Sequence, residues 1–246
     1  MDETLISAIR ERYQCVLGQI ADATARSRRV AGAVRLVVVS KSQPLEVVRA
    51  AIAAGVSILG ENYAEEAVAK IAALRETAVE WHMIGHVQSR KADLVAQHFS
   101  LLHSLDSIEL AGRLDRFCDE SGRTLPVLLE VNISGEGSKY GFPAWDERQW
   151  PDLEPEIEQI MTFPRLRLTG LMTMPPFFDD PEQTRPYFQR LRRLQYFLKE
   201  RFPRYDWTNL SMGTSVDFIA AVEEGATYVR VGQAILGPRP VYKSYD

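Results

Sequence analysis

Apolar residues occur in two patterns that alternate along the chain: a helical period and short uninterrupted runs. In the first segment they recur at steps of three and four residues, which predicts an amphipathic helix over about 4–25. The next apolar run, VRLVVV over 34–39, is rich in β-branched residues and has no polar alternation. This pattern is typical of a strand that is buried on both faces of a parallel sheet. Further apolar runs predict strands at about 56–59, 81–85, 99–105, 125–133, 166–172, 207–211 and 226–231.

Helical patterns lie between these strands, near 44–54, 61–76, 90–97, 107–120, 152–162, 181–201 and 215–223. Several have start signals. Asp180 precedes Pro181 as an N-cap, and the segments 106–109 and 214–217 have the spacing of a capping box. Eight strands that alternate with helices predict an α/β fold, a (β/α)8 TIM barrel over about 34–238 with an extra N-terminal helix. An open, doubly wound parallel sheet is the alternative. Since no linker divides the chain, we expect a single domain over 1–246.

Composition and charge narrow the class of protein. The 246 residues are 46% hydrophobic and 25% charged, which is ordinary for a globular protein and excludes disordered and collagen-like chains. The net charge of −4 leaves no basic surplus for a nucleic-acid backbone. Cys15 and Cys118 form no metal or redox motif. The acidic N-terminus is not a signal peptide, and no apolar run approaches the ~20 residues that span a bilayer. We therefore expect a soluble cytoplasmic protein without a membrane partner.

Polar side chains lie at or near the carboxyl end of each predicted strand. In a barrel, active sites gather at the carboxyl ends of the strands. The residues at these positions are Lys41, Asn62, His86, Asp106, Asn132, Thr173, Ser211 and Arg230. We expect the site to be built from members of this set.

Lys41 follows the apolar strand at 34–39, separated from it only by Ser40. Burial at the rim of a barrel disfavours the ammonium form of a lysine, which can lower its pKa and leave a nucleophilic amine. Such amines form Schiff bases with carbonyl compounds. The alternative is a lysine whose stem lies along the rim and whose ammonium reaches solvent.

Two turns near the end of the chain could bind an anion. The segment 211–215 opens the helix after the seventh strand, and the segment 232–237 follows the eighth. Exposed backbone N–H groups at such turns bind phosphate in many barrels. The alternative is that Thr214 and Asp217 only cap their own helix.

Other motifs have less support. His82 and His86 have a spacing that would bind zinc on a helix, but the segment reads as a strand, where it separates them by ~13 Å. We therefore predict no metal site. The chain also has no P-loop, no GxGxxG after its first strand and no GxSxG nucleophile motif.

Seven segments together resemble a known family. They are VVVSKSQP (37–44), GENYAEEAVAK (60–70), WHMIGHVQSRK (81–91), EVNISGEGSKYGF (130–142), LTGLMTM (168–174), LSMGTSVDF (210–218) and VRVGQAILG (229–237). In order and spacing they are similar to the pyridoxal phosphate (PLP) homeostasis protein family. Its members are single-domain, fold-type III PLP-binding barrels related to the N-terminal domain of alanine racemase.

The resemblance implies a role for each matching residue. Lys41 would bind PLP as a Schiff base, and Arg230 would face the pyridine nitrogen. Asn62 would lie beside the cofactor. Ser211, Gly213, Gly232 and Gln233 would surround the phosphate, although Gln233 stands where the family usually has threonine. No catalytic residue is assigned.

The implied function is intracellular PLP homeostasis, in which the chain holds PLP on Lys41 and delivers it to apo-enzymes without a committed turnover. An arginine at the pyridine nitrogen keeps that nitrogen unprotonated, which weakens the ring as an electron sink. The alternatives are a weak PLP-dependent racemase, a Schiff-base lyase that recruits Asp106 or His86, or a protein-interaction module. The tail PRPVYKSYD (238–246), with Tyr242 and Tyr245, is expected to be too short to form the second domain of a racemase. We expect a monomer.

Overall fold

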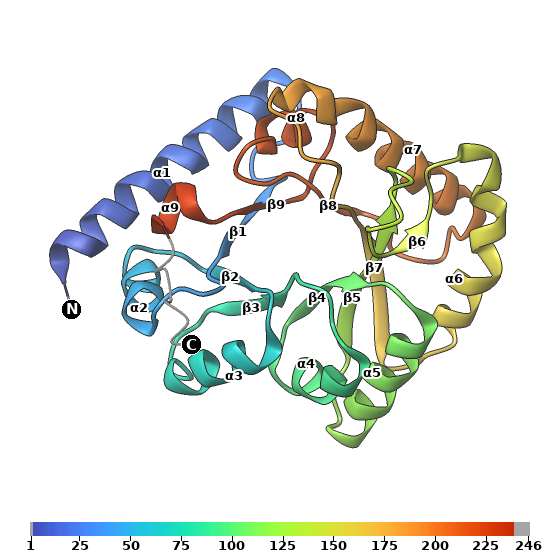
Figure 1. Cartoon of the computed structure of the whole chain (residues 1–246), viewed down its shortest axis with the longest axis horizontal. Helices are drawn as coiled ribbons and strands as arrows, with labels where there is room; N and C mark the ends of the chain where they lie inside the picture. The colour runs from blue at the N-terminus through green and yellow to red at the C-terminus, as the bar shows by residue number, and fades with distance from the viewer. Residues whose placement is uncertain (1, 239–246) are drawn as a thin grey trace, which may run out of the picture.

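A computed structural model of the chain describes residues 2–238, so Tyr242 and Tyr245 lie outside the described residues. Within that range, parallel strands form a closed ring (Figure 1). Each strand of the ring pairs with its neighbours in the order β1–β2–β3–β4–β5–β7–β8–β9, and the pairing of β9 with β1 closes the ring. The predicted (β/α)8 barrel is therefore confirmed, and the open-sheet alternative is wrong.

The strands lie close to the predicted positions. The ring consists of β1 (Arg35–Val39), β2 (Ile58–Glu61), β3 (Glu80–Met83), β4 (Leu101–Leu105), β5 (Leu125–Asn132), β7 (Leu166–Met172), β8 (Asn209–Ser211) and β9 (Tyr228–Val231). A two-residue strand, β6 (Phe142–Pro143), pairs with the end of β5 outside the ring. It was not predicted, and it positions the loop that precedes it at the carboxyl end of the barrel.

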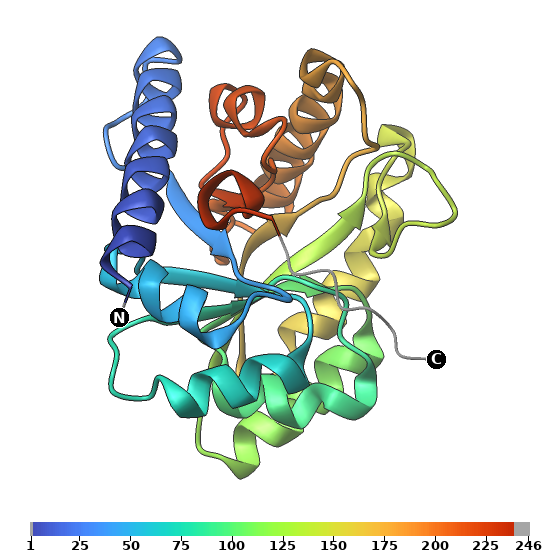
Figure 2. The same cartoon turned by 60° about the vertical axis from the view of Figure 1, so that its left-hand side comes forward.

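Helices surround the ring (Figures 1 and 2). They are α1 (Glu3–Arg26), α2 (Leu45–Ala53), α3 (Ala64–Ala73), α4 (Ala92–His98), α5 (Ile108–Glu120), α6 (Glu154–Met161), α7 (Arg185–Arg201), α8 (Phe218–Glu223) and α9 (Gln233–Leu236). Short 3₁₀ turns, η1 (Ser89–Lys91), η2 (Glu147–Leu153) and η3 (Pro181–Thr184), precede α4, α6 and α7. The long α1 lies outside the ring and packs against α2, α8 and α9.

Two of the predicted helix starts differ in detail. The N-cap of α5 is Ser107, whose side chain accepts from the backbone N–H of Leu110. Asp106 is therefore not the cap, and its carboxylate is available to a different partner. Before α8, the Asp217 carboxylate accepts the backbone N–H of Thr214 at 2.6 Å. The later residue of the predicted capping box therefore caps the earlier one. The predicted cap at Asp180 is confirmed by its bond from the N–H of Glu182.

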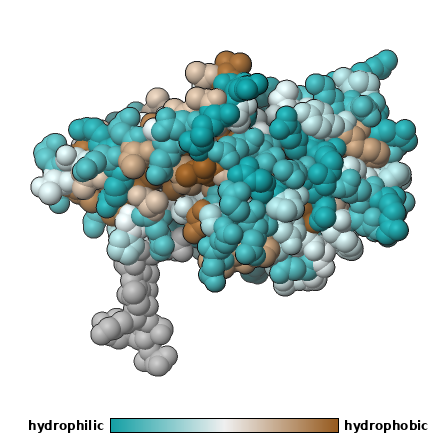
Figure 3. All heavy atoms as spheres, turned by 90° about the horizontal axis from the view of Figure 1, so that it is seen from above, coloured by the Kyte–Doolittle hydropathy of each residue, from teal (hydrophilic) through white to brown (hydrophobic). Residues whose placement is uncertain are grey.

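Most of the core lies between the ring and its helices. The ring's interior holds a smaller apolar cluster of Val37, Ile58, Leu101, Leu128, Met172 and Tyr228. The face of the molecule shown in Figure 3 is mainly hydrophilic, with apolar side chains in scattered patches. Among residues 2–238, no helix combines the length and the apolar character that a membrane crossing requires.

Candidate functional site

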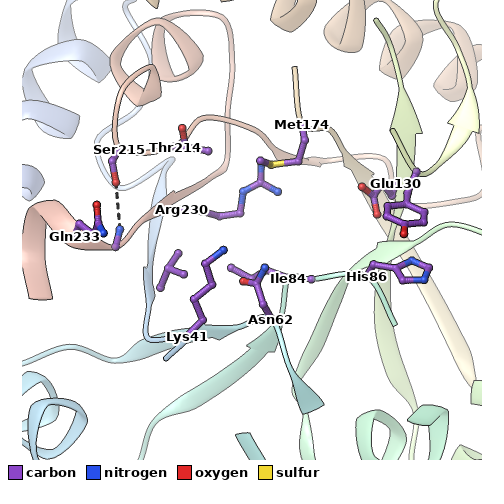
Figure 4. Close-up of a pocket in the computed structure, with 14 residues that line it drawn as sticks. Lys41, Asn62, Ile84, His86, Glu130, Met174, Thr214, Ser215, Arg230 and Gln233 are labelled. Carbon is purple, nitrogen blue, oxygen red and sulfur yellow. Dashed lines mark hydrogen bonds between the residues drawn. The ribbon is translucent and has the colours of Figure 1, made fainter. Parts of the chain in front are cut away.

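A cavity of about 350 Å³ opens at the carboxyl ends of the ring strands (Figure 4). This volume falls in the range of roughly 300–1,000 Å³ that small-molecule sites occupy. Five of the seven predicted site residues line the cavity together: Lys41, Asn62, Arg230, Gly232 and Gln233. Ser211 and Gly213, the other two, are not among its lining residues.

A buried ion pair holds the backbone just before Lys41. Lys70 on α3 is 6% exposed, and its ammonium donates to the carbonyl oxygen of Ser40 and to Glu61 Oε1, both at 2.8 Å. The Ser40 hydroxyl also donates to Glu61 Oε1, at 2.7 Å. Burial raises the pKa of the Glu61 carboxyl, and the bond from Lys70 opposes that shift. Two neighbouring elements, β2 and α3, thereby fix where the chain leaves β1.

The same ammonium secures the residue on the other side of Lys41. Lys70 donates to Glu66 Oε1 at 2.6 Å, and this oxygen accepts the backbone N–H of Ser42 at 2.8 Å. Ser42 has a φ of 57°, in the left-handed region that non-glycine residues seldom adopt. The carboxylate at its N–H stabilises that turn. As a result the Lys41 side chain extends into the cavity, between Arg230 and Asn62 (Figure 4).

Arg230 projects from β9 into the cavity and is 4% exposed. Its Nη2 donates to the carbonyl oxygen of Thr173 at 2.8 Å. Nε and Nη1 are buried and have no hydrogen-bond partner among residues 2–238. Burial lowers the pKa of Arg230 to about 10, and the nearby carboxylates of Glu130 and Asp217 oppose the shift. The guanidinium therefore stays charged at neutral pH, with unused donors at the cavity wall.

Ser211 lies at the end of β8 and is directed to the inside of the ring. Its hydroxyl is 2.7 Å from Nδ1 of His103, and His103 Nε2 is 3.0 Å from Nδ1 of His82. His82 Nε2 lies 3.3 Å from a carboxylate oxygen of Glu80. Burial lowers the pKa of both histidines, so both are neutral, whereas the bond with His82 lowers the pKa of Glu80 to about 2.

These protonation states fix the direction of the hydrogen bonds. The Glu80 carboxylate can only accept, so Nε2 of His82 must carry its hydrogen. Nδ1 of His82 then accepts from His103, and Nδ1 of His103 accepts from the Ser211 hydroxyl. The hydroxyl hydrogen of Ser211 is therefore engaged inside the barrel rather than in the cavity.

Gly213 also contributes to the site without lining the cavity. Its φ is 93°, and a Cβ at this position would lie 2.5 Å from the Cβ of Ala221 on α8. Its carbonyl oxygen accepts the backbone N–H of Arg230 at 3.0 Å. Glycine is thus required here for the turn and for the close approach of α8, which together position the loop at Thr214 and Ser215.

The loop after β8 meets the start of α9 at one end of the cavity. The backbone N–H of Gly232 donates to the Ser215 hydroxyl at 3.3 Å (Figure 4). A Cβ at Gly232 would lie 3.2 Å from the carbonyl oxygen of Val39, so only a glycine keeps this distance without a shift. Hydroxyl and backbone N–H groups gather here, as the predicted anion site requires.

The opposite end of the cavity contains one residue of the predicted strand-end set, His86, and two residues that were not predicted. Glu130 on β5, Tyr140 before β6 and His86 after β3 line it. The rings of His86 and Tyr140 stack at 4.0 Å, and Nδ1 of His86 is 2.7 Å from Oδ2 of Asp106. A signal for Glu130 was present, because an acidic residue interrupts the apolar run at 125–133. Tyr140 gave no such signal.

Comparisons with known proteins show the family of the chain. The family model of the alanine racemase N-terminal domain matches residues 16–240. A pyridoxal phosphate homeostasis protein of Vibrio alginolyticus is 37% identical over 238 residues, covering 95% of this chain and 99% of the relative.

Solved structures with the same fold lead to the same family. PipY of Synechococcus elongatus PCC7942 with PLP bound has a TM-score of 0.77 and 36% identity, over 89% of this chain and 100% of PipY. Alanine racemase of Bartonella henselae, at 15% identity and a TM-score of 0.66, shares the fold over 98% of this chain and 61% of its own. The chain therefore belongs to the pyridoxal phosphate homeostasis protein family, within the wider family of the alanine racemase N-terminal domain.

Proposed function

We propose that the chain binds PLP in this cavity as a Schiff base on Lys41 and so takes part in PLP homeostasis. The observation that carries the proposal is the pair of buried donors on Arg230, unpartnered within residues 2–238 and close to the Lys41 side chain (Figure 4). Buried donors nearly always have an acceptor, so these two call for a ligand. Relatives at 37% identity bear the homeostasis name, and PipY has been solved with PLP.

The residues present fit the functional groups of PLP. Its pyridine nitrogen is an acceptor that suits the free donors of Arg230. When bound, PLP supplies an aldehyde that condenses with a primary amine, and Lys41 offers that amine. Asn62 Oδ1 is also buried without a partner among the described residues, and it could accept from a hydroxyl group of a ligand.

The phosphate belongs at the end of the cavity formed by Ser215, Gly232 and Gln233. The hydroxyl hydrogen of Ser215 and the backbone N–H of Gln233 are donors of the kind that bind a phosphate, and the N–H of Gly232 positions the Ser215 hydroxyl. The predicted roles of Ser211 and Gly213 are then indirect. Ser211 fixes the end of β8 through His103, and Gly213 shapes the turn that carries residues 214 and 215.

Charge at the pyridine end favours a carrier over a catalyst. Arg230 remains a cation at neutral pH, since its pKa stays at about 10. A cation at this position keeps the pyridine nitrogen unprotonated, and an unprotonated ring withdraws electrons less strongly than a pyridinium does. We infer that the chain stores PLP and passes it to apo-enzymes. We expect it to act as a monomer in the cytoplasm, where its free thiols, Cys15 and Cys118, stay reduced.

One observation favours a second candidate, a weak racemase or lyase. His86 lines the cavity and lies 2.7 Å from Asp106, so its imidazole could exchange a proton with a bound amino acid. The two functions are distinguished by incubating PLP-loaded protein with an amino acid in deuterated water. Exchange of the α-proton that depends on Lys41 indicates an enzyme, and its absence supports a carrier.

The central test is an absorbance spectrum of the purified protein before and after PLP is added. We expect a visible band that disappears on borohydride reduction and is missing in Lys41→Ala. Lys199→Ala is the matched control, because Lys199 is exposed in the last turn of α7 and does not line the cavity, so its loss should leave the band unchanged. A wild-type protein that shows no band with PLP in excess would overturn the proposal.

A further inference from the structure

Glu130 is a buried carboxylate that faces the cavity. It lies on β5, is 8% exposed and lines the end of the cavity away from Ser215 and Gln233 (Figure 4). Its carboxylate accepts no hydrogen bond from any residue in 2–238. The carboxylate oxygens are not among the fully buried atoms that lack a partner, so they face the open space of the cavity. An ionised carboxylate that is largely removed from water and has no protein donor is costly. A ligand that donates hydrogen bonds or carries positive charge would offset that cost.

The charged groups around Glu130 come from several elements. Asp106, after β4, adds negative charge, whereas Arg230 on β9 and Lys139, before β6, add positive charge. Burial, and secondarily Asp106, raises the pKa of Glu130 to about 7, and Arg230 and Lys139 oppose the shift. The group can therefore gain or lose a proton at physiological pH.

The backbone holds Glu130 firmly in this position. Gly141 has a φ of 100°, and a Cβ at Gly141 would lie 2.5 Å from the carbonyl oxygen of Glu130. This close approach brings the preceding residue, Tyr140, over His86, where the two rings stack. His86 in turn pairs with Asp106, whose side chain is only 8% exposed. This end of the cavity thus combines the Glu130 carboxyl group with an aromatic face, and the Asp106 carboxylate lies behind His86 without lining the cavity.

This combination suits a small cation. Carboxylates accept strong hydrogen bonds from ammonium groups, and aromatic faces attract cations. A phosphate or carboxylate would instead be repelled by Glu130 and Asp106. The Arg230 donors and the Lys41 amine lie next to this end of the cavity, so a group bound here is close to the proposed PLP aldehyde (Figure 4).

We propose that this end of the cavity binds the primary ammonium group of an incoming amine and that Glu130 takes a proton from that ammonium group. The amine is the acceptor of the PLP aldehyde, so the inference rests on the proposed function. The step is a proton transfer from R–NH₃⁺ to the Glu130 carboxylate, which gives R–NH₂ and a neutral carboxylic acid. Only the neutral amine has the lone pair needed to replace Lys41 at the aldehyde carbon. Glu130 would then be a catalytic residue in the transfer of PLP to the amine, and it would not be needed for holding PLP on Lys41.

Binding can be tested on the protein without PLP. The probe is Nα-acetyl-L-lysine amide, which has one primary ammonium group, and the control is Nα,Nε-diacetyl-L-lysine amide, which has none. The ¹³C carboxyl resonance of Glu130, assigned by its loss in Glu130→Gln, is followed over pH. We expect the probe to lower the pKa of Glu130 and the control to leave it unchanged. An equal effect, or no effect, of the two compounds would overturn the proposal.

Transfer is then measured on PLP-loaded protein, with rates expressed per loaded molecule. We expect the wild-type rate with Nα-acetyl-L-lysine amide to rise through an inflection near pH 7. Glu130→Gln should lower the rate at least tenfold and remove the inflection, as loss of a general base does. Glu130→Asp should keep part of the wild-type rate and part of the inflection. Glu109→Gln, on the exposed face of α5, is the matched control and should behave as the wild type.

A Glu130→Gln protein that keeps both the rate and the inflection would overturn the inference. Failure of the proposed function gives a different result, because the wild type would then not load PLP at all. Comparing the lysine amide with L-alanine identifies the source of the ammonium group. Faster transfer to the amide indicates a protein side chain, and faster transfer to alanine indicates a free amino acid.

Discussion

Arg230 donates a 2.8 Å hydrogen bond from Nη2 to the carbonyl oxygen of Thr173, and this bond fixes which of its nitrogens remain available. Nη2 also lies 3.1 Å from Sδ of Met174. With Nη2 engaged at the end of β7, Nε and Nη1 are the buried donors without a partner among the described residues. The guanidinium is thus oriented by the backbone of a neighbouring strand before any ligand arrives.

Arg230→Gln is expected to weaken PLP binding about 10- to 100-fold. A hydrogen bond to a charged group contributes about 1.5–3 kcal/mol, and each 1.4 kcal/mol corresponds to a tenfold change in Kd. The measurement is a titration of the protein with PLP, followed by absorbance. Arg193→Gln, which removes an exposed arginine paired with Glu147, should leave Kd unchanged. Equal affinity of Arg230→Gln and the wild type would contradict the role of Arg230.

Lys70→Met is expected to destabilise the fold by about 3–5 kcal/mol. The substitution leaves the buried Glu61 carboxylate without its cation, and breaking a buried ion pair from one side is strongly destabilising. The free energy of unfolding is measured in urea. The double variant Lys70→Met/Glu61→Gln should recover part of the loss, because it leaves no uncompensated charge at residue 61.

Lys91→Met is the control for that series. Lys91 pairs with Glu65, whose side chain is 55% exposed, and exposed pairs contribute at most about 1 kcal/mol. A Lys70→Met protein as stable as Lys91→Met would show that the buried pair is not needed. PLP binding by Lys70→Met should also weaken, since the carbonyl oxygen of Ser40 loses its donor and Glu66, which accepts the N–H of Ser42, loses its cation.

Buried charged residues such as Glu61 also explain why some strand bounds could not be predicted from the sequence. The pattern placed the second strand at about 56–59, but β2 continues through Gly60 and Glu61, because Lys70 neutralises a carboxylate that the pattern treats as a strand end. β7 has the predicted bounds, and its apolar run contains no charged residue after Arg167. Periodicity reports burial only where the buried residue is apolar.

The candidate site was predictable in part for a similar reason. Lys41, Asn62 and Arg230 lie within two residues of the carboxyl end of an apolar strand, so their position in the sequence was enough to predict that they lie at one rim. Tyr140 depends on the turn at Gly141 and the short β6, and neither leaves a periodic pattern. Asp106 was assigned to a helix cap because its spacing allowed it, but Ser107 takes that position and Asp106 pairs with His86.

Gly85→Ala is expected to destabilise the protein by about 1–3 kcal/mol, as overpacking in a filled region does. A Cβ at Gly85 would lie 2.6 Å from the carbonyl oxygen of Asn62 and 2.7 Å from its Cα. The backbone that carries Asn62 must move, so PLP affinity should fall together with stability. Thermal unfolding and a PLP titration measure the two effects.

The control for that substitution is Gly18→Ala. Gly18 lies in α1, where the methyl group of an alanine would have no atom of the described residues within 4 Å beyond its own helix and chain neighbours. Alanine favours a helix over glycine by about 1 kcal/mol. This variant should therefore be more stable than the wild type and should bind PLP equally well. A Gly85→Ala protein that behaves like Gly18→Ala would contradict the close approach at Asn62.

Glu130→Gln is expected to make the protein more stable at pH 8 and to have little effect near pH 4. The pKa of Glu130 is about 7 in the folded state against 4.5 for the free group, so the folded state binds the proton more tightly. Between these values the folded state holds more protons than the unfolded one, and stability therefore falls as pH rises from 4.5 to 7. The difference corresponds to roughly 3 kcal/mol, which glutamine removes because it does not ionise. Urea unfolding of both proteins at several pH values measures it. A gain in stability that is the same at pH 4 and pH 8 would show that packing, and not the buried charge, is responsible.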